Sequence, residues 1–401
     1  MTTELGGRLG RPVALVAAVW LGLSAFPAAQ QAEGLPQSVT DAAVARAHAE
    51  QGMPGMAAGQ PAAVAEYPSL RFAGFGNIDF AAQDQTEGPR GFSEGQFVLH
   101  LVSALSPQVN VFGELSFTPR TDAGAGSPAA TGFNAEVERL IIRFDQSDEL
   151  KVSFGRYHTP INWWNTAYHH GAWLQTTISR PEMAQFGGKF IPVHFVGALA
   201  EGALPSSGWN LNYQVGIGNG RGTVISRGGD AGDNNATPAW VLNLFAKPDR
   251  TFGLQVGGSV YLDKVSLTAT GPEFREQIVA GHLVWQREDP ELIAEIAHVR
   301  HEAIVDSSTS SNLAYYVQTA YRLPWLKRLW KPYYRFEHIG IDSADGVFTG
   351  TNLVQNLNGS TLGVRYDISA YAAIKTEGRW RERASGQPST NGWFFQVSFT
   401  F

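Results

Sequence analysis

The sequence of 401 residues contains no cysteine. Disulfide bonds, thiolate metal ligands, a cysteine nucleophile, covalently attached haem and a lipid-bearing N-terminal cysteine are therefore excluded. The absence fits a protein that passes through an oxidising compartment such as the bacterial periplasm.

Charged residues are also scarce, at 16% of the chain compared with roughly 25% in an average soluble domain. Beyond the N-terminus there is no run of about 18 apolar residues, so the sequence offers no membrane-spanning helix. The net charge is −6, which argues against nucleic acid as a partner. The abundant residues are instead 44 glycines and 11% aromatics, a composition that favours one long all-β barrel.

The first 29 residues have the layout of a secretory signal peptide. Arg8 and Arg11 precede an apolar stretch at residues 12–26, and small residues follow it. An uncleaved anchor helix is the alternative, although the apolar stretch is shorter than a spanning helix requires.

Residues 30–68 are rich in Ala, Gln, Gly and Pro and expose little apolar surface for a core. We expect them to form a flexible periplasmic leader, within which a short helix could form. The folded barrel is expected to occupy residues 69–401.

From Ser69 onward, apolar residues alternate with polar or small residues in segments of about ten, the length of a membrane-spanning strand. In residues 209–218, one face carries Trp209, Leu211, Tyr213, Val215 and Ile217. The other face carries only Asn, Gln and Gly, and is too polar for a protein core. A period of two indicates a β-strand, and a polar face opposite an aromatic-rich face indicates water on one side and lipid on the other.

The connections between these segments alternate regularly between short turns and long loops rich in Gly, Ser and Asn. Seven short turns and eight long loops join 16 strands. Short periplasmic turns and long extracellular loops are typical of outer-membrane barrels. The predicted fold is therefore a transmembrane antiparallel β-barrel of 16 strands.

The last ten residues, GWFFQVSFTF, alternate large apolar and polar side chains and end in phenylalanine. Phe395, Phe399 and Phe401 lie on one face and resemble the signal by which the barrel-assembly machinery recognises outer-membrane proteins. The alternative is a soluble strand that happens to end in phenylalanine, which would expose five large apolar residues unless they were covered.

These features together resemble Gram-negative porins, and more closely the phosphate-selective porin O and P family. The stretches VSFGRYHTP at residues 152–160, LGVRYDIS at 362–369 and YAAIKTEGRW at 371–380 add to the resemblance. It implies an outer-membrane homotrimer, without cofactor, through which small hydrophilic solutes or ions diffuse passively. Phosphate-selective members of the family carry ladders of Arg and Lys in the pore, whereas basic and acidic residues are interleaved in this sequence. Passive diffusion of small hydrophilic solutes is therefore the predicted function, and an anion- or phosphate-selective porin is the alternative.

The third long loop, residues 160–191, is the longest of the eight. Its aromatic and basic residues are Trp163, Trp164, His169, His170, Trp173, Arg180 and Lys189. In porins the third loop folds inward and narrows the pore, and the resemblance implies the same constriction here. The alternative is an external loop packed on its neighbours or on the next subunit.

Strand alternation places charged residues on the face toward the pore, because a charge facing lipid costs roughly 2–4 kcal/mol near the midplane. The predicted pore-lining residues are Glu114, Arg139, Arg143, Lys151, Arg335, Glu337, Arg365, Asp367, Lys375, Glu377 and Arg379. On the fourth strand the same alternation assigns Val137 to the face of Arg139. These charges either select ions or only keep the wall hydrated. The basic group of Arg139, Arg143 and Lys151 predicts a modest preference for anions.

No metal site or catalytic site is predicted. His169 and His170 are adjacent, with His158 and His194 on either side of the loop, and adjacent residues rarely converge on one metal ion. No nucleophile with a neighbouring base is recognisable, so an outer-membrane enzyme or a non-conducting scaffold is kept only as an alternative.

Overall fold

The computed structural model describes residues 67–84, 90–120, 122–127, 129–168, 170–186, 189–226, 228–268, 271–351, 354–383 and 390–401. The predicted signal peptide and residues 30–66 of the predicted leader lie outside this part of the chain. Within the described residues, no helix is both long enough and apolar enough to cross a membrane.

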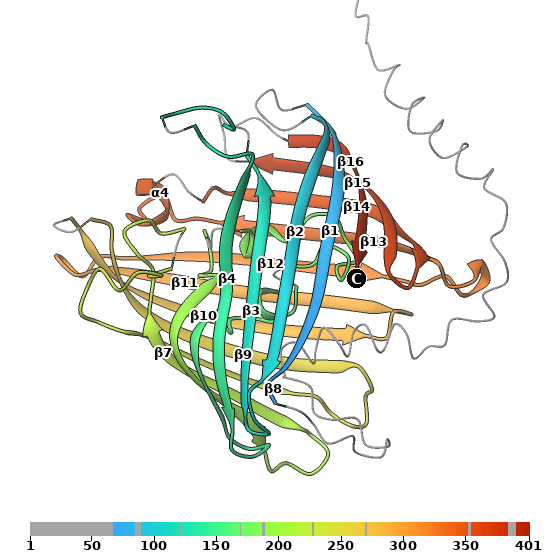
Figure 1. The fold of residues 1–401 in the computed structure, drawn as a ribbon. Coiled ribbons are helices and arrows are strands. Elements are labelled where there is room, and N and C mark those ends of the chain that lie inside the picture. Colours follow the sequence, from blue (N-terminus) through green and yellow to red (C-terminus); the bar gives the residue numbers. More distant parts are fainter. Residues whose placement is uncertain are drawn as a thin grey trace, which may run out of the picture. The chain divides into compact units, whose positions relative to one another are not determined.

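The described residues form 16 strands that are joined in one ring (Figure 1). The strands are β1 (Ser69–Gln83), β2 (Gly91–Ala104), β3 (Val109–Pro119), β4 (Phe133–Asp145), β5 (Lys151–His158), β6 (His194–Leu204), β7 (Leu211–Asn219), β8 (Ala239–Ala246), β9 (Leu254–Ser266), β10 (Glu273–Gln286), β11 (Glu291–Ala303), β12 (Thr309–Ala320), β13 (Trp330–Gly340), β14 (Leu357–Ser369), β15 (Ala372–Arg383) and β16 (Thr390–Thr400). The helical turns are α3 (Trp164–Ala167), η1 (Glu182–Ala184), η2 (Pro324–Leu326) and α4 (Phe348–Thr351).

Each strand pairs antiparallel with the next, and β1 pairs with β16 to close the barrel. The predicted fold class and strand number are therefore confirmed. The predicted strict alternation of short and long connections does not hold everywhere, because the connection from β11 to β12 is only residues 304–308, whereas the one from β12 to β13 is residues 321–329. The connection from β14 to β15 is the shortest of the turns, residues 370–371, because β14 continues to Ser369 with a register shift after Asp367.

The two faces of the strands differ in exposure in the way the alternation predicts. On β4, Leu140, Ile142 and Phe144 are exposed, whereas Arg143 on the other face is only 4% exposed. The outward face of the barrel is thus apolar and the inward face carries the charges, which is the arrangement that lipid outside a barrel requires.

A β-bulge in β4 overturns the prediction for Val137. Glu114 pairs with Arg139 and Leu115 pairs with Val137, so Glu138 is the extra residue of the bulge. One inserted residue reverses the faces beyond it. Glu138 is consequently buried on the inside, and Val137, 49% exposed, faces outward.

The seam between β1 and β16 depends on two glycines beneath aromatic rings. Gly76 pairs with Phe399, and Gly74 exchanges backbone hydrogen bonds with Phe401 at 3.0 and 3.1 Å. A Cβ atom on Gly74 would lie 2.3 Å from the Phe401 ring, and one on Gly76 would lie 2.5 Å from the Phe399 ring. Rings that cover backbone glycines in this way stabilise strand pairing where glycine alone would weaken it.

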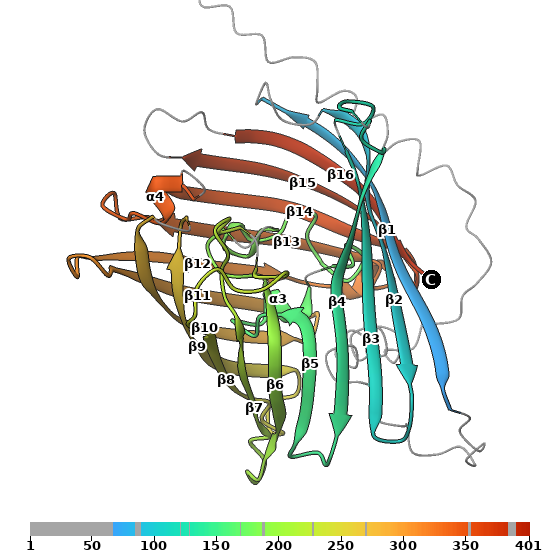
Figure 2. The ribbon, with the colours of Figure 1, turned by 60° about the vertical axis from the view of Figure 1, so that its left-hand side comes forward.

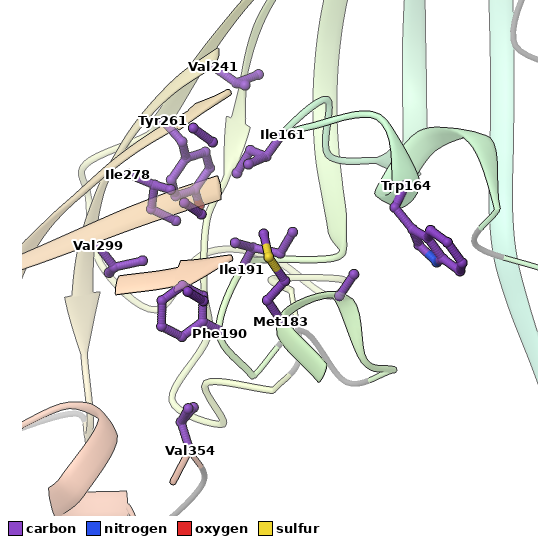
Figure 3. Packing of buried hydrophobic residues seen from close by; sticks show 14 of the residues in the cluster. Ile161, Trp164, Met183, Phe190, Ile191, Val241, Tyr261, Ile278, Val299 and Val354 are labelled. Carbon is purple, nitrogen blue, oxygen red and sulfur yellow. The ribbon is translucent and has the colours of Figure 1, made fainter. Parts of the chain in front are cut away.

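Part of the barrel interior is an apolar core, where the alternation predicts a hydrated wall (Figure 3). Ile278 on β10 and Val299 on β11 face inward and are fully buried. They belong to one cluster with Ile161, Phe190 and Ile191 of the third loop. The sequence carries a signal for this core, because residues 278–285 (IVAGHLVW) of β10 are apolar or small on both faces except for His282.

Candidate functional site

The third long loop, which connects β5 to β6, lies inside the barrel (Figure 2). The backbone N–H groups of Trp163 and Trp164 donate hydrogen bonds of 2.8 and 2.6 Å to Glu295 on β11. His170 of the same loop lies 2.8 Å from Glu114 on β3. In the ring of 16 strands β3 and β11 are opposite each other, so a segment that contacts both crosses the interior.

Three basic side chains predicted to line the pore hold the loop through its carbonyl groups. Arg335 donates to the Ser179 carbonyl at 2.8 Å, to the Ser179 hydroxyl at 2.6 Å and to the Arg180 carbonyl at 3.0 Å. Arg365 donates to the carbonyls of Trp173 and Gln175. Lys375 donates to the carbonyls of Ala172 and Thr177. All three come from neighbouring strands, β13 to β15.

Acidic side chains on the same wall accept hydrogen bonds from the loop. Glu377 accepts from the N–H groups of Ile178 at 2.9 Å and Ser179 at 3.1 Å. Glu337 accepts from the N–H group of Glu182 at 2.6 Å. Carboxylates and basic groups therefore bind the N–H and carbonyl groups of one loop backbone, which fixes its position more firmly than apolar contact alone.

Most of the remaining predicted pore-lining residues are in ion pairs along the wall. Arg139 contacts Glu114, Arg143 lies 2.6 Å from Asp145 and 3.6 Å from Glu201, and Arg379 contacts Glu377. Asp367 pairs with Arg322 and Arg365, and Lys151 is the register partner of Asp145 and Glu201. The basic group of Arg139, Arg143 and Lys151 is therefore interleaved with acids.

The loop residues named from the sequence have different environments. Trp163, Trp164, His170, Trp173 and Arg180 are buried, whereas Lys189 is exposed. His169 lies outside the described residues.

Several buried polar residues could not be predicted from the sequence, because alternation does not show the distances between residues on different strands. Glu295, described above, is one of them. A second group joins Arg221, Glu276, His301 and Asp345, with His301 lying 3.0 Å from Glu276 and 2.7 Å from Asp345. Burial raises the pKa of Asp345, but the hydrogen bond and the charge of His301 outweigh it and hold the pKa well below its usual value. This group fastens the long loops after β7 and β13 to the barrel wall.

Glu288, in the short turn between β10 and β11, is the centre of a charge network at the other end of the barrel. Arg322 donates to its carboxylate at 2.5 and 3.2 Å, and Lys331 donates at 3.3 Å. Burial alone would raise the pKa of Glu288, but Lys331 and Arg322 outweigh it and lower the pKa from 4.5 to about 2. The charged carboxylate therefore stabilises the folded state above pH 4.5, and this contribution is lost as the pH falls toward 2.

Replacement of Glu288 by glutamine is expected to lower the free energy of unfolding at pH 7 by about 3 kcal/mol, the equivalent of the pKa shift. Between pH 4.5 and 2, the stability of the variant should also fall less than that of the native protein. Urea unfolding of the purified barrel at pH 7 and pH 3 measures both effects. Glu149→Gln, at a fully exposed turn residue, is the control, and equal stability of the two variants would contradict the prediction.

No family model and no curated protein matches this chain. Solved structures match it along most of its length. An anion-selective porin from Comamonas acidovorans superposes with a TM-score of 0.59 and 11% identity, covering 83% of this chain and 99% of its own. The chain has the porin fold.

Two further structures share this porin fold. OmpF of Salmonella typhi in complex with daunomycin has a TM-score of 0.56 and 11% identity, over 83% of this chain and 98% of its own. The trimer form of OmpT, an outer membrane protein of Vibrio cholerae, has a TM-score of 0.53 and 11% identity, over 84% and 100%. The more specific resemblance to phosphate-selective porins stays a prediction.

Proposed function

We propose that this protein is an outer-membrane porin through which small hydrophilic solutes and ions diffuse passively. The observation that carries the proposal is a closed barrel of 16 strands whose outward face is apolar and whose inward face carries paired charges. Such a barrel replaces lipid with a polar wall and so lowers the barrier to a hydrated solute. The short turns then face the periplasm and the long loops face the exterior.

The third loop is proposed to narrow the pore, and its contacts suggest where the path runs. The apolar core occupies the space between the loop and part of the wall, including β10 and β11. Charged side chains there and on β13 are almost fully buried, as Glu276 and Arg335 are at 0% exposure. Arg139 on β4 and Arg379 on β15 keep 12% and 17% of their side chains exposed. We therefore propose that the aqueous path runs past Arg139 and Arg379, off the centre of the barrel.

A barrel that does not conduct, serving as a scaffold or an enzyme, is the second candidate. The observation in its favour is the burial of the third loop. Trp164 is 0% exposed, and the backbone N–H groups of Trp163 and Trp164 donate hydrogen bonds to Glu295. A loop bound to strands on different sides of the barrel could block the passage of solutes.

Single-channel recording of the purified protein in a planar bilayer under a KCl gradient separates these candidates. Stable conductance steps support the porin, and steps in groups of three support the homotrimer proposed from the resemblance. Heat-modifiable migration on a denaturing gel establishes that the protein is folded. Absence of steps with folded protein would contradict the porin and favour the closed barrel.

The reversal potential in the same recording tests ion preference. Simultaneous neutralisation of Arg139, Arg143 and Lys151 to glutamine should shift the reversal potential toward cations, since Glu114 and Asp145 then lose basic partners. The opposite change, glutamine in place of Glu114 and Asp145, should shift it toward anions. An unchanged potential in both variants would show that this wall does not set ion preference.

A further inference from the structure

Histidines and carboxylates from four neighbouring strands and the third loop meet at one place. His158, the last residue of β5, and His194, the first residue of β6, are register partners at the base of the loop, with ring centroids 5.5 Å apart. Glu114 comes from β3, and the bulge in β4 turns Glu138 to the same side. His170 reaches this group from within the loop.

Three of these side chains offer metal-binding atoms in close proximity. One ligand atom each from Glu114, His158 and His170 lie within 4.8 Å of one another, and all three residues are buried. Ligands of a tetrahedral Zn²⁺ ion lie roughly 3.3 Å apart, given metal–ligand distances of about 2.0–2.1 Å. Side-chain movements of about 1 Å would therefore bring these atoms into a coordination sphere.

Glu138 lies beside these three residues, on the other side of the His170 ring. One of its oxygens lies 3.6 Å from Nε2 of His170, whereas Glu114 lies 2.8 Å from Nδ1 of the same ring. The other oxygen of Glu138 lies 3.0 Å from Nε2 of His194. An ion bound at Nδ1 would leave Nε2 facing Glu138, which is the usual place of a carboxylate that orients a metal-binding histidine.

Glu114 is supported in the same manner. Nε2 of His100, its register partner on β2, lies 3.1 Å from Oε1 of Glu114. Arg139 contacts the other carboxylate oxygen and balances part of the negative charge of the two glutamates. The ring of His170 stacks on the ring of Phe186, with the ring centroids 5.3 Å apart, and this contact holds His170 in place.

We propose that Glu114, His158 and His170, with water as the fourth ligand, bind one divalent transition-metal ion of the zinc class. Two imidazoles and one carboxylate suit Zn²⁺ and related ions, whereas Ca²⁺ and Mg²⁺ prefer a shell of oxygens alone. The ion would join the third loop, through His170, to strands β3 and β5.

The test is the metal content of the full mature protein, folded in detergent and purified without a polyhistidine tag. After incubation with Zn²⁺ and removal of free ion, elemental analysis should find one zinc per chain. Replacement of His158 and His170 together by glutamine should abolish this stoichiometric binding. The matched control replaces His282 on β10 and His298 on β11 by glutamine. It also removes two imidazoles, but both lie outside the cluster, so zinc binding should be unchanged.

Co²⁺ in place of Zn²⁺ should give visible absorption bands of a four-coordinate site in the native protein and in the control, but not in the cluster variant. Native protein without bound metal, or equal binding by both variants, would overturn the proposal. If the double variant does not fold, the single His170→Gln change, in a loop residue, takes its place. Metal binding is measured without any recording of current, so a protein that binds no metal would leave the porin proposal unaffected.

Discussion

Replacement of Arg335 and Arg365 by alanine together is expected to raise single-channel conductance several-fold and to make the current noisier. Arg335 donates three hydrogen bonds to Ser179 and Arg180, and Arg365 donates two to Trp173 and Gln175. Without them, buried carbonyl groups of the loop lose their donors and the loop can move away from β13 and β14.

The size of the effect follows from the strength of these bonds. A hydrogen bond to a charged group contributes about 1.5–3 kcal/mol. A net loss of only about 3 kcal/mol would already shift the equilibrium between attached and detached loop by roughly a hundredfold. The detached state, with a wider pore, should therefore become visible in the recordings.

Arg275→Ala with Arg300→Ala is the matched control, because these arginines keep 65% and 45% of their side chains exposed. The control should conduct like the native protein. Unchanged conductance in a folded variant of Arg335 and Arg365 would mean that the loop does not limit the current.

The second large effect is expected at the seam of the barrel. Valine in place of both Gly74 and Gly76 should reduce the folded fraction to a minority, because each Cβ would overlap the ring of Phe401 or Phe399. Overpacking of this kind typically costs 1–3 kcal/mol per site, and here it acts on the strand pair that closes the ring. Heat-modifiable migration and protease resistance measure the folded fraction.

Gly132→Val is the control, since its Cβ would have no neighbouring atom within 4 Å. A further test combines Gly76→Val with Phe399→Ala, which removes the ring that the valine would strike. If the clash is the cause, the double variant should fold better than Gly76→Val alone. Normal folding of the Gly74 and Gly76 variant would show that the rings can move aside at little cost.

The sequence was sufficient to predict the barrel because alternation is a local property. Leu140 and Ile142 face outward as their positions predict. The assembly-signal prediction for Phe395, Phe399 and Phe401 stays a prediction, although Phe399 and Phe401 are now assigned to the barrel seam.

What could not be predicted depends on distance between segments. The bulge at Glu138 shows in the sequence only as two consecutive charged residues, Glu138 and Arg139, and it reversed the prediction for Val137. His100 and Glu114 are 14 residues apart, and His158 and His194 are 36 apart, so only strand register brings each pair together. The partners of the loop, such as Glu295 and Arg335, are more than 100 residues away from it.

The contacts of the third loop with opposite walls also have a mechanical consequence. An open barrel of this width can become elliptical when the surrounding bilayer compresses it sideways. Here the loop bridges the wall at Glu114 to the wall at Glu295 through its backbone and His170. Widening the barrel along this diameter would stretch that bridge, and narrowing it would compress a close-packed core. The loop thus acts as an internal brace that makes the cross-section insensitive to lateral pressure from the membrane.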